Sequence, residues 1–386
     1  MHIGIDARMY GTKHRGIGRY VASLIDGLAR AHTKHRFTIF TSKESVGSIP
    51  KAGGRFRIVE TEVPWYSAQE QFAMPKIVQN ARVGAMHWPH LNVPYFCPVP
   101  YVVTIHDLIV FHFPSSRATG LPKWQYCLKL KGYDIVLRRA VAKAKAIIAV
   151  SAFTRRDIVR HLGVDEEKIT VTHLGVDRMI LGTDTLKNSS QYNKNLTKMF
   201  GIAKPYLLYV GSAYPHKNLT SLLRAFYELR TRYRRNWQLV LAGRDDRFYQ
   251  QMRQFVEKTI PDEQIRKDII FTGQVDEAQL DGLYRSAKLF VFPSLYEGFG
   301  LPPLEAMSRG VPVVASNRSS LPEVLSDAAS YCNPEDINSI AGAIDSIGGN
   351  AALQQEFSKK GIARAQRFSW DKTIQQTLGV YRKLEE

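Results

Sequence analysis

The sequence predicts an α/β protein made of two doubly wound units joined by a linker. Short apolar runs, typical of strands buried on both faces, alternate with amphipathic helical stretches along almost the whole chain. The alternation stops once, in a stretch rich in Ser, Thr and Asn with the sequence LGTDTLKNSSQYNKNLTKMF. The 386 residues suffice for two units, each with its own hydrophobic core.

Composition is typical of a globular protein of a reducing compartment. Apolar residues make up 44% and charged residues 23% of the sequence, and no apolar run approaches the ~18 residues that span a bilayer. The first strand begins at Ile3, which leaves no room for a signal peptide. Cys97, Cys127 and Cys332 are odd in number and far apart, so neither a disulfide framework nor a zinc site is indicated. We therefore expect a cytoplasmic location.

The chain is strongly basic, with a net charge of +18. The first 197 residues contain 28 Lys and Arg against 14 Asp and Glu, so most of the excess lies in the first half. A nucleic-acid-binding protein is one alternative, but the basic residues are scattered and no recognised nucleic-acid module is present. The segment 122–145 mixes Lys and Arg with aromatic and Leu residues. It predicts either a helix on an anionic membrane surface or a core-packed helix with a solvated basic face.

The first half opens with the strand HIGID, the glycine-bearing loop GTKHRGIGRY, and the helix YVASLIDGLARA. Gly16 and Gly18 fall in the predicted turn between strand and helix. The strands FTIFT, AMHWPH, YVVTIHDLI, AIIAVS and ITVTHLGVD follow. His106 and Asp107 end the strand YVVTI, at the edge of a parallel sheet where ligands bind. His87 and His90 follow another strand, in a Pro-rich loop for which loop packing is favoured over a metal site.

The second half repeats the alternation. The strand YLLYV ends at Gly211, and Lys217 lies in the loop before an amphipathic helix. The strand WQLVLAG ends before Arg244, and the strand IIFTG is followed by Gln274 and Val275.

One stretch, SLYEGFGLPPLEAMSRGVPVVAS, organises the rest of the chain. After the buried strand LFVFPS, a loop with Glu297, Gly298 and Gly300 leads into a helix that two prolines begin. We expect Glu305 in the first turn of this helix. Two carboxylates would then flank one helix N-terminus at the carboxyl end of a strand. A helix N-terminus favours phosphate, and carboxylates accept hydrogen bonds from sugar hydroxyls.

This stretch resembles the E-x7-E signature of the retaining glycosyltransferases of family four. The likeness rests on Glu297, the sequence GFGLPPL, Glu305 and the following AMSRGVPVVAS, and it extends over essentially the whole chain. It implies the GT-B fold, in which two Rossmann-like domains face each other across a cleft. On this basis we expect an N-terminal acceptor-side domain over 1–178, a linker over 179–199 and a nucleotide-sugar-binding domain over 200–367. A C-terminal helix over 368–386 would pack back on the first domain.

The resemblance also implies roles for individual residues. His106, which touches the transferred sugar in the family, Glu297 and Lys217 are the expected catalytic residues. The residues expected to bind the donor are Gly16, Gly18, Gly211, Lys217, Val275, Glu297, Gly298, Phe299, Gly300, Leu301 and Glu305. Many family members have an Arg where this chain has Ser212 or His216. The missing positive charge is either absent or comes from Arg15, Arg19 or Arg244.

GIDAR, GIGRY and VGSAYPHKN resemble the mannosyltransferase-like branch that acts in polysaccharide or O-antigen assembly. This favours GDP-mannose as donor and a glycan or lipid-linked acceptor, while UDP-sugars stay open. A sugar-nucleotide epimerase on the same fold is a second alternative. We expect no metal or other cofactor, no nucleic-acid partner, and an anionic membrane surface as a further partner on the inner face of the cytoplasmic membrane.

Overall fold

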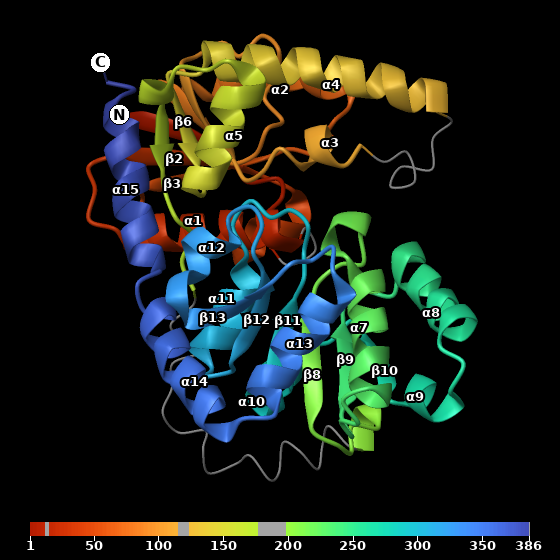
Figure 1. Ribbon diagram of the computed structural model, residues 1–386. Helices are drawn as coiled ribbons and strands as arrows, with labels where there is room; N and C mark the ends of the chain where they lie inside the picture. The colour runs from red at the N-terminus through yellow and green to blue at the C-terminus, as the bar shows by residue number, and fades with distance from the viewer. Residues whose placement is uncertain (12–14, 115–122, 177–197, 386) are drawn as a thin grey trace. The chain divides into compact units, whose positions relative to one another are not determined.

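The computed structural model describes residues 1–11, 15–114, 123–176 and 198–385 (Figure 1). The chain forms two compact units, of which one consists of Met1–Gly175 with Ser369–Glu386 and the other of Val176–Phe368. Most of the expected linker falls on 177–197 and lies outside the described residues. Among the described residues, no helix is long and apolar enough to cross a membrane.

The first unit contains a parallel sheet of seven strands in the order β3-β2-β1-β4-β5-β6-β7. Its strands are β1 (His2–Asp6), β2 (Arg36–Thr41), β3 (Phe56–Glu60), β4 (Ala85–Trp88), β5 (Tyr101–Ile105), β6 (Ala146–Ala149) and β7 (Ile169–Val171). Its helices are α1 (Arg15–Arg30), α2 (Ala68–Ala81), α3 (Ile109–His112), α4 (Lys123–Lys143), α5 (Ala152–Leu162) and α15 (Trp370–Arg382), with short 3-10 turns at Lys43–Ser48 and Glu166–Lys168.

The second unit contains a parallel sheet of six strands in the order β10-β9-β8-β11-β12-β13. Its strands are β8 (Tyr206–Val210), β9 (Gln238–Ala242), β10 (Ile269–Gly273), β11 (Leu289–Phe292), β12 (Val313–Ser316) and β13 (Ala329–Cys332). Its helices are α7 (Leu219–Thr231), α8 (Arg247–Thr259), α9 (Glu263–Lys267), α10 (Glu277–Ser286), α11 (Leu301–Ser308), α12 (Leu321–Leu325), α13 (Ile337–Gly348) and α14 (Ala351–Ala365), with 3-10 turns at Pro215–Lys217 and Ser326–Ala328.

Burial explains why the strands have continuous apolar sequences. Every residue of β4, β5, β6, β9, β11 and β12 is buried, as expected for strands covered by helices on both faces. In each sheet the strand order reverses once, between β1 and β4 and between β8 and β11. Such a reversal leaves a crevice at the carboxyl ends of the two strands, which is where open α/β sheets bind ligands.

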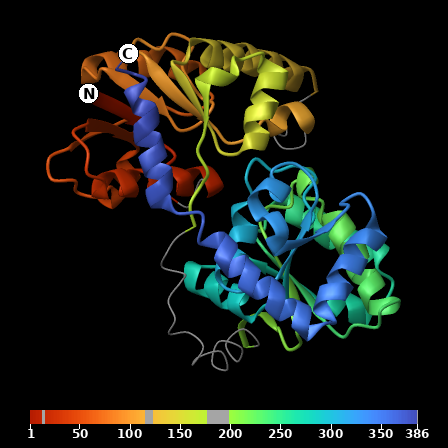
Figure 2. The ribbon, with the colours of Figure 1, turned by 60° about the vertical axis from the view of Figure 1, so that its left-hand side comes forward.

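The C-terminal helix α15 belongs to the first unit although 193 residues separate that unit's two chain segments. Figure 2 shows α15, in dark blue, alongside the red N-terminal part of this unit. The hydroxyl of its Tyr381 is hydrogen-bonded to Nδ1 of His87 at 2.7 Å, and the hydroxyl of its Thr373 donates to the carbonyl of His173 at 2.7 Å. The helix is therefore held by buried polar contacts as well as by its apolar face.

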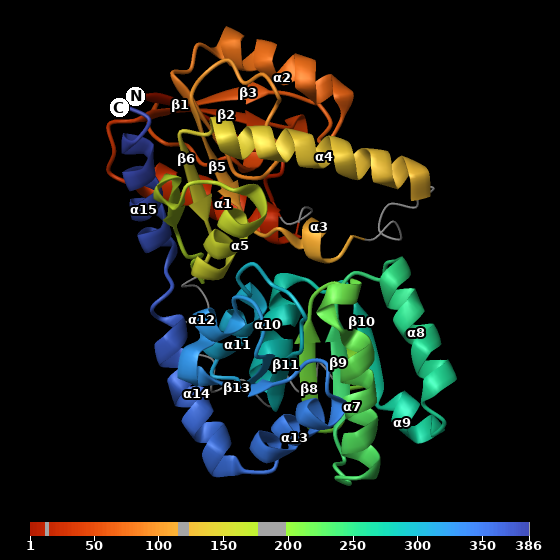
Figure 3. The same ribbon diagram turned by 45° about the horizontal axis from the view of Figure 1, so that its top comes forward.

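Helix α4 has two different halves. Leu137, Ala140 and Val141 anchor its C-terminal half in the core of the first unit. Toward its N-terminal end, which extends past the strands in Figure 3, Trp124 is 64% and Leu128 61% exposed. Of the two interpretations of segment 122–145, core packing thus applies to the C-terminal half, whereas the N-terminal half presents apolar and basic side chains to solvent.

Candidate functional site

The second sheet brings two predicted loops together at its reversal point. The loop after β8 runs from Gly211 to the N-cap of α7 at Asn218, and the loop after β11 runs from Pro293 to the N-cap of α11 at Gly300. Because β8 and β11 are hydrogen-bonded neighbours, the two loops leave the sheet side by side. The amide of Leu295 donates to the carbonyl of His216 at 2.7 Å, which fixes one loop against the other.

An ion pair joins these loops. The ammonium of Lys217 lies 2.5 Å from Oε1 of Glu297, and the two side chains are only 17% and 11% exposed. The same ammonium lies 5.4 Å from the ring centre of Phe292, the last residue of β11. Lys217 and Glu297, which the sequence placed 80 residues apart, thus form one partly desolvated charged pair, whose attraction is stronger than in open water.

Two serines hydrogen-bond to the backbone of the Glu297–Gly300 loop and hold it in place. Ser319 accepts from the amide of Glu297 at 2.9 Å, and the fully buried Ser320 donates to the carbonyls of Glu297 and Phe299 at 2.9 and 3.0 Å. Gly298, Phe299 and Gly300 are all buried. A rigid loop of this kind keeps its geometry before a ligand arrives, which lowers the cost of binding.

Gly300 is the N-cap of α11 in the left-handed conformation, with φ of 99°, and as a glycine it has no side chain with which to cap this helix N-terminus. A Cβ at Gly300 would lie 2.7 Å from Leu321, so both the backbone angle and the space favour glycine. Leu301 is the first residue of α11 and is partly buried. The N-terminal end of α11 carries the partial positive charge of the helix dipole and can bind a phosphate.

Glu305 lies one turn further into α11 than the sequence predicted. The helix begins at Leu301, so its fifth residue is Glu305 and the first turn contains no acid. The side chain is 4% exposed and accepts a hydrogen bond from the hydroxyl of Tyr284 at 3.0 Å. Arg309 stacks on the Tyr284 ring, 4.6 Å from its centre, and donates to the Glu305 carbonyl at 2.9 Å. The carboxylate therefore has a fixed position one turn behind Gly300.

Glycines lie at the carboxyl ends of three neighbouring strands: Gly211 after β8, Gly243 after β9 and Gly273 at the end of β10. Of these, only Gly211 was assigned a role from the sequence. The amide of Gly211 donates to Ala242 at 3.0 Å, and its carbonyl accepts from the hydroxyl of Tyr249 at 2.8 Å. A Cβ at Gly243 would lie 2.1 Å from the carbonyl oxygen of Gly211, so any side chain there would displace this strand end. The need for glycine at position 243 comes from the close approach of two backbones in the folded protein, which a single sequence does not show.

Val275 is partly buried and directly precedes Asp276, the N-cap of α10.

His216 does not supply the missing positive charge. Burial, with a smaller contribution from the neighbouring ammonium of Lys217, lowers its pKa to about 3, so the imidazole is neutral at pH 7. Its ring stacks on Tyr214 with 5.9 Å between ring centres. Arg244 is exposed, Arg19 lies in the first unit, and the side chain of Arg15 is outside the described part of the chain. Whether one of these arginines supplies the charge, or the site has one fewer, stays a prediction.

His106 directly follows β5 in the first unit. Its Nε2 lies 2.9 Å from the carbonyl oxygen of Pro89, and its ring meets the edge of Tyr20 at 4.7 Å between centres. Burial lowers the pKa of His106 to about 4 despite the hydrogen bond to Pro89. The imidazole is therefore neutral at pH 7 and donates from Nε2, which leaves Nδ1 as an acceptor for a hydroxyl group.

Two family models divide the chain in the same way as its two sheets. Residues 14–179 match the model described as Glycosyltransferase Family 4, and residues 198–364 match the model described as Glycosyl transferases group 1. The chain belongs to the family-four glycosyltransferases of the GT-B fold.

Relatives of this glycosyltransferase share its full length. O-antigen chain mannosyltransferase B of Escherichia coli is 29% identical over 96% of this chain and 96% of that protein. Serotype-specific mannosyltransferase WbdA of Escherichia coli is 28% identical over 100% of this chain but only 48% of that longer protein. Among solved structures, sucrose-phosphate synthase from Thermosynechococcus elongatus has a TM-score of 0.76 at 20% identity and covers 100% of this chain and 99% of that one, which is a likeness of fold.

Gly16 and Gly18 of the glycosyltransferase do not lie in a loop. Helix α1 begins at Arg15 rather than at the predicted Tyr20, so both glycines lie in its first turn, with Gly16 exposed and Gly18 buried. The prediction of a loop was wrong because two glycines lower helix propensity and obscure the helix start. Similarly, His87 lies within β4 rather than after it.

A buried ionic network lies at the reversal point of the first sheet, and no sequence pattern indicated it. Arg8 is 2% exposed and pairs with Asp6 at 2.7 Å and with Glu70 at 2.5 Å. Glu70 also accepts from Asn92 at 2.5 Å and from the amide of Tyr66 at 2.9 Å. Although burial opposes it, these two carboxylates raise the pKa of the Arg8 guanidinium above its ordinary value. The network ties the chain after β1 to the loops near His90. Because Arg8, Glu70 and Asn92 are far apart in sequence, no local sequence pattern links them.

Proposed function

We propose that this glycosyltransferase transfers mannose from GDP-mannose to a glycan or lipid-linked acceptor with retention of anomeric configuration. The observation that carries the proposal is the Lys217–Glu297 pair beside the N-terminus of α11, at the reversal point of the second sheet. A cation, a carboxylate and a helix N-terminus in one place suit a sugar joined to a diphosphate. In the bound state each of these three groups contacts a different part of the donor.

The charges that develop during transfer assign the roles. Cleavage of the bond between sugar and diphosphate leaves positive charge at the anomeric carbon and further negative charge on the nucleotide diphosphate. Lys217 and the N-terminal end of α11 stabilise the leaving diphosphate. Because Lys217 is already paired with Glu297, the diphosphate competes for the ammonium and releases the carboxylate toward the sugar hydroxyls. The proposed chemistry requires no metal ion, since these groups supply the positive charge.

Glu305 binds the ribose hydroxyls in this proposal. Its hydrogen bond from Tyr284 and its low exposure hold the carboxylate in one orientation, which suits recognition of two adjacent hydroxyls. Gly211 and Val275, at the ends of β8 and β10, contribute backbone to the nucleotide side of the site.

Retention follows if the acceptor attacks on the face from which the diphosphate leaves. The bond from the acceptor oxygen to the anomeric carbon forms as the bond to the phosphate oxygen breaks, and that phosphate oxygen takes the acceptor's proton. No carboxylate nucleophile is required. Neutral His106 accepts a hydrogen bond from a hydroxyl of the transferred sugar through Nδ1.

The names of two relatives that match along almost all of this chain support mannose as the sugar and O-antigen polysaccharide as the product class. Both are named as mannosyltransferases, and one name refers to the O-antigen chain. GDP-mannose is then the donor that fits, with a growing glycan on a lipid carrier as acceptor.

A lipid-linked acceptor gives a purpose to the exposed half of α4. Trp124, Leu128 and Ile135 are 59% or more exposed, and their spacing of four and seven residues places them on one side of the helix. Lys129 and Lys131 are exposed between them. We propose that this surface, called the α4 surface below, rests on an anionic membrane, with the apolar side chains in the headgroup region and the lysines on the lipid phosphates.

Thermal unfolding in the presence of nucleotides and nucleotide sugars tests the proposal. A ligand at 100 times its Kd adds about 2.7 kcal/mol of stability. For units of this size that corresponds to a rise in Tm of roughly 5 to 10 °C. GDP and GDP-mannose should stabilise the protein and UDP-sugars should not. NMR of the products then distinguishes transfer, which yields GDP and an α-linked glycan, from epimerisation, which yields an isomerised donor.

A further inference from the structure

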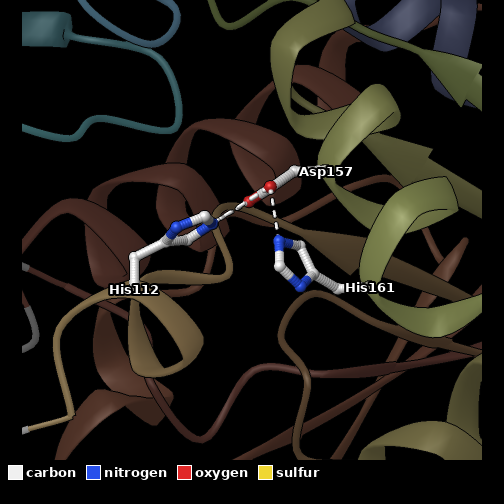
Figure 4. Close-up of side chains that lie close together, drawn as sticks. All are labelled: His112, Asp157 and His161. Carbon is white, nitrogen blue, oxygen red and sulfur yellow. Dashed lines mark hydrogen bonds and ion pairs between the residues drawn. The ribbon is translucent and has the colours of Figure 1, made fainter.

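Two histidines and an aspartate converge in the first unit, between α3 and α5. Figure 4 shows the imidazoles of His112 and His161 directed at the carboxylate of Asp157. Nε2 of His112 lies 2.9 Å from one carboxylate oxygen, and Nε2 of His161 lies 3.3 Å from the other. One ligand atom from each of the three side chains lies within 4.8 Å of both others.

The elements that carry these side chains hold them in place. Asp157 and His161 are four residues apart on α5, which places them on one face of the helix, and His112 ends α3. The imidazole planes of His112 and His161 are nearly perpendicular, with 5.0 Å between ring centres, and Phe111 stacks on His161 at 5.8 Å. Asp157 is 6% exposed, while the two histidines are 29% and 30% exposed. A buried carboxylate thus lies behind two imidazoles that solvent can reach.

We propose that His112, Asp157 and His161 form a site for one Zn²⁺ ion. Two imidazole nitrogens and one carboxylate oxygen are a donor set that zinc prefers, with water as the fourth ligand. Tetrahedral bonds of about 2.0 to 2.2 Å require ligand atoms to lie about 3.3 to 3.6 Å apart. The two nitrogen–oxygen separations of 2.9 and 3.3 Å need shifts of only a few tenths of an ångström, and the two imidazole nitrogens lie within 4.8 Å of each other.

Zinc can replace the hydrogen bond between His112 and Asp157 without release of a proton. The carboxylate of Asp157 accepts a hydrogen bond from Nε2 of His112 at 2.9 Å, whereas Nε2 of His161 lies 3.3 Å from it as an ion-pair contact. A neutral imidazole that binds zinc through Nε2 keeps its one proton on Nδ1, so the His112 ring changes tautomer without losing a proton. The nitrogen ligands exclude Mg²⁺ and Ca²⁺, which prefer an all-oxygen environment.

The site connects to the segment that follows His106. The hydroxyl of Thr154, on the same face of α5 as Asp157 and His161, lies 3.4 Å from the carbonyl of His106. Helix α3, which carries His112, begins three residues after His106. An ion that joins α3 to α5 therefore fixes both ends of the segment from His106 to His112. Zinc acts here as a clamp on the conformation of this segment and has no part in the transfer chemistry.

Competition with a chromophoric chelator measures the site directly. Wild-type protein should hold one Zn²⁺ at least about 10-fold more tightly than His112→Ala or Asp157→Asn. Asp157→Asn keeps an acceptor for the imidazoles and nearly the same shape, so it separates metal binding from packing. His32→Ala, which removes an exposed histidine of the same unit, is the matched control and should behave as the wild type. Titration with Co²⁺ should give the intense visible absorption of a tetrahedral site in the wild type and not in Asp157→Asn.

Several results would overturn the proposal. Equal zinc affinity of Asp157→Asn and wild type would mean that the cluster is only a hydrogen-bonded contact. Loss of affinity in His32→Ala as large as that in His112→Ala would indicate non-specific binding to surface histidines. Circular dichroism of each variant shows whether it is folded, and should His112→Ala not fold, the Asp157→Asn result alone decides.

Discussion

The ammonium of Lys217 lies 2.5 Å from the carboxylate of Glu297 and links two loops from neighbouring parallel strands. Both side chains are largely removed from water, yet neither is part of the hydrophobic core. A structural pair would hold the loops whether or not a ligand is bound. At the point where the strand order reverses, next to a helix N-terminus without a side-chain cap, the pair instead has the composition of a site that exchanges partners with a phosphate.

Substitution of the two carboxylates, Glu297 and Glu305, should have different effects on binding and turnover. Glu305→Ala should weaken GDP binding by about 10- to 100-fold, because hydrogen bonds to a charged group contribute about 1.5 to 3 kcal/mol. Glu297→Ala should mainly lower kcat, because contacts to the sugar matter most at the reacting centre. Steady-state kinetics with GDP-mannose measures both. Tyr284→Phe, which removes only the hydroxyl that holds Glu305, should reproduce a smaller loss of GDP affinity. Wild-type kinetics in either carboxylate variant would contradict these roles.

His106→Ala should lower the rate of transfer by at least about tenfold, the effect of one lost hydrogen bond of about 1.5 kcal/mol. The residue lies in the first unit, whereas the proposed nucleotide groups lie in the second, so the affinity for GDP should not change. Calorimetry with GDP supplies the second measurement. A loss of GDP affinity as large as the loss of rate would show that His106 acts on the nucleotide site or on the fold.

The α4 surface should bind vesicles that contain anionic lipid, and the binding should weaken with salt. Charge reversal at Lys129 and Lys131 should lower the affinity by at least about tenfold, because each cation near the surface contributes ~1 kcal/mol. The same reversal at Lys43 and Lys51, which are exposed elsewhere in the first unit, is the control with equal net charge. Sedimentation with neutral and anionic vesicles gives the result. Equal binding to both kinds of vesicle, or tighter binding to duplex DNA, would count against a membrane role.

Mild acid should destabilise the first unit through His87. The side chain is 0% exposed, and burial lowers its pKa to about 3, with a smaller contribution from His106. In the unfolded chain an ordinary histidine has a pKa of about 6.5, so the unfolded state binds the extra proton and stability falls as the pH drops below that value. From pH 7 to pH 5 the loss should be about 2 kcal/mol for this group.

Denaturant unfolding followed by tryptophan fluorescence measures this loss. Trp65, Trp88, Trp124 and Trp370 lie in the first unit and only Trp237 in the second, so the signal reports mainly the first unit. His87→Gln should be less stable at pH 7 and lose less on acidification, whereas His32→Gln should follow the wild type. If His87→Gln had the same pH dependence as the wild type, other groups would account for the acid sensitivity.

Most of the fold could be predicted from the sequence because the central strands are buried on both faces and have uninterrupted apolar sequences. The edge strands β3 and β13 were missed. In β3 the pattern is weak, since Ile58 is 38% exposed and charged residues surround it. In β13 the two middle residues are partly exposed. A strand covered on one side only lacks the continuous apolar run that identifies the others.

The candidate site was predictable only where its signal is local. The loop around Glu297 and the helix that follows it form a continuous pattern of acid, glycine and proline, and the structure has that loop and helix, with Glu305 one turn later than expected. The network of Arg8 and Glu70 joins residues 62 positions apart, and the three-residue cluster of His112 joins α3 to α5 across 45 positions. Contacts of this kind depend on tertiary packing and leave no periodic trace in the sequence.

Calorimetric titration of GDP into wild type, Lys217→Ala and Lys217→Arg tests the central claim most directly, because it asks whether the pair beside α11 binds a diphosphate. The wild type should bind GDP, Lys217→Arg should retain most of the affinity because the charge remains, and Lys217→Ala should bind at least about 10-fold more weakly. Tighter binding of GDP than of GMP would locate the lysine at the terminal phosphate. Equal GDP affinity of Lys217→Ala and wild type, or no binding of any nucleoside diphosphate by the wild type, would contradict the assignment of this site.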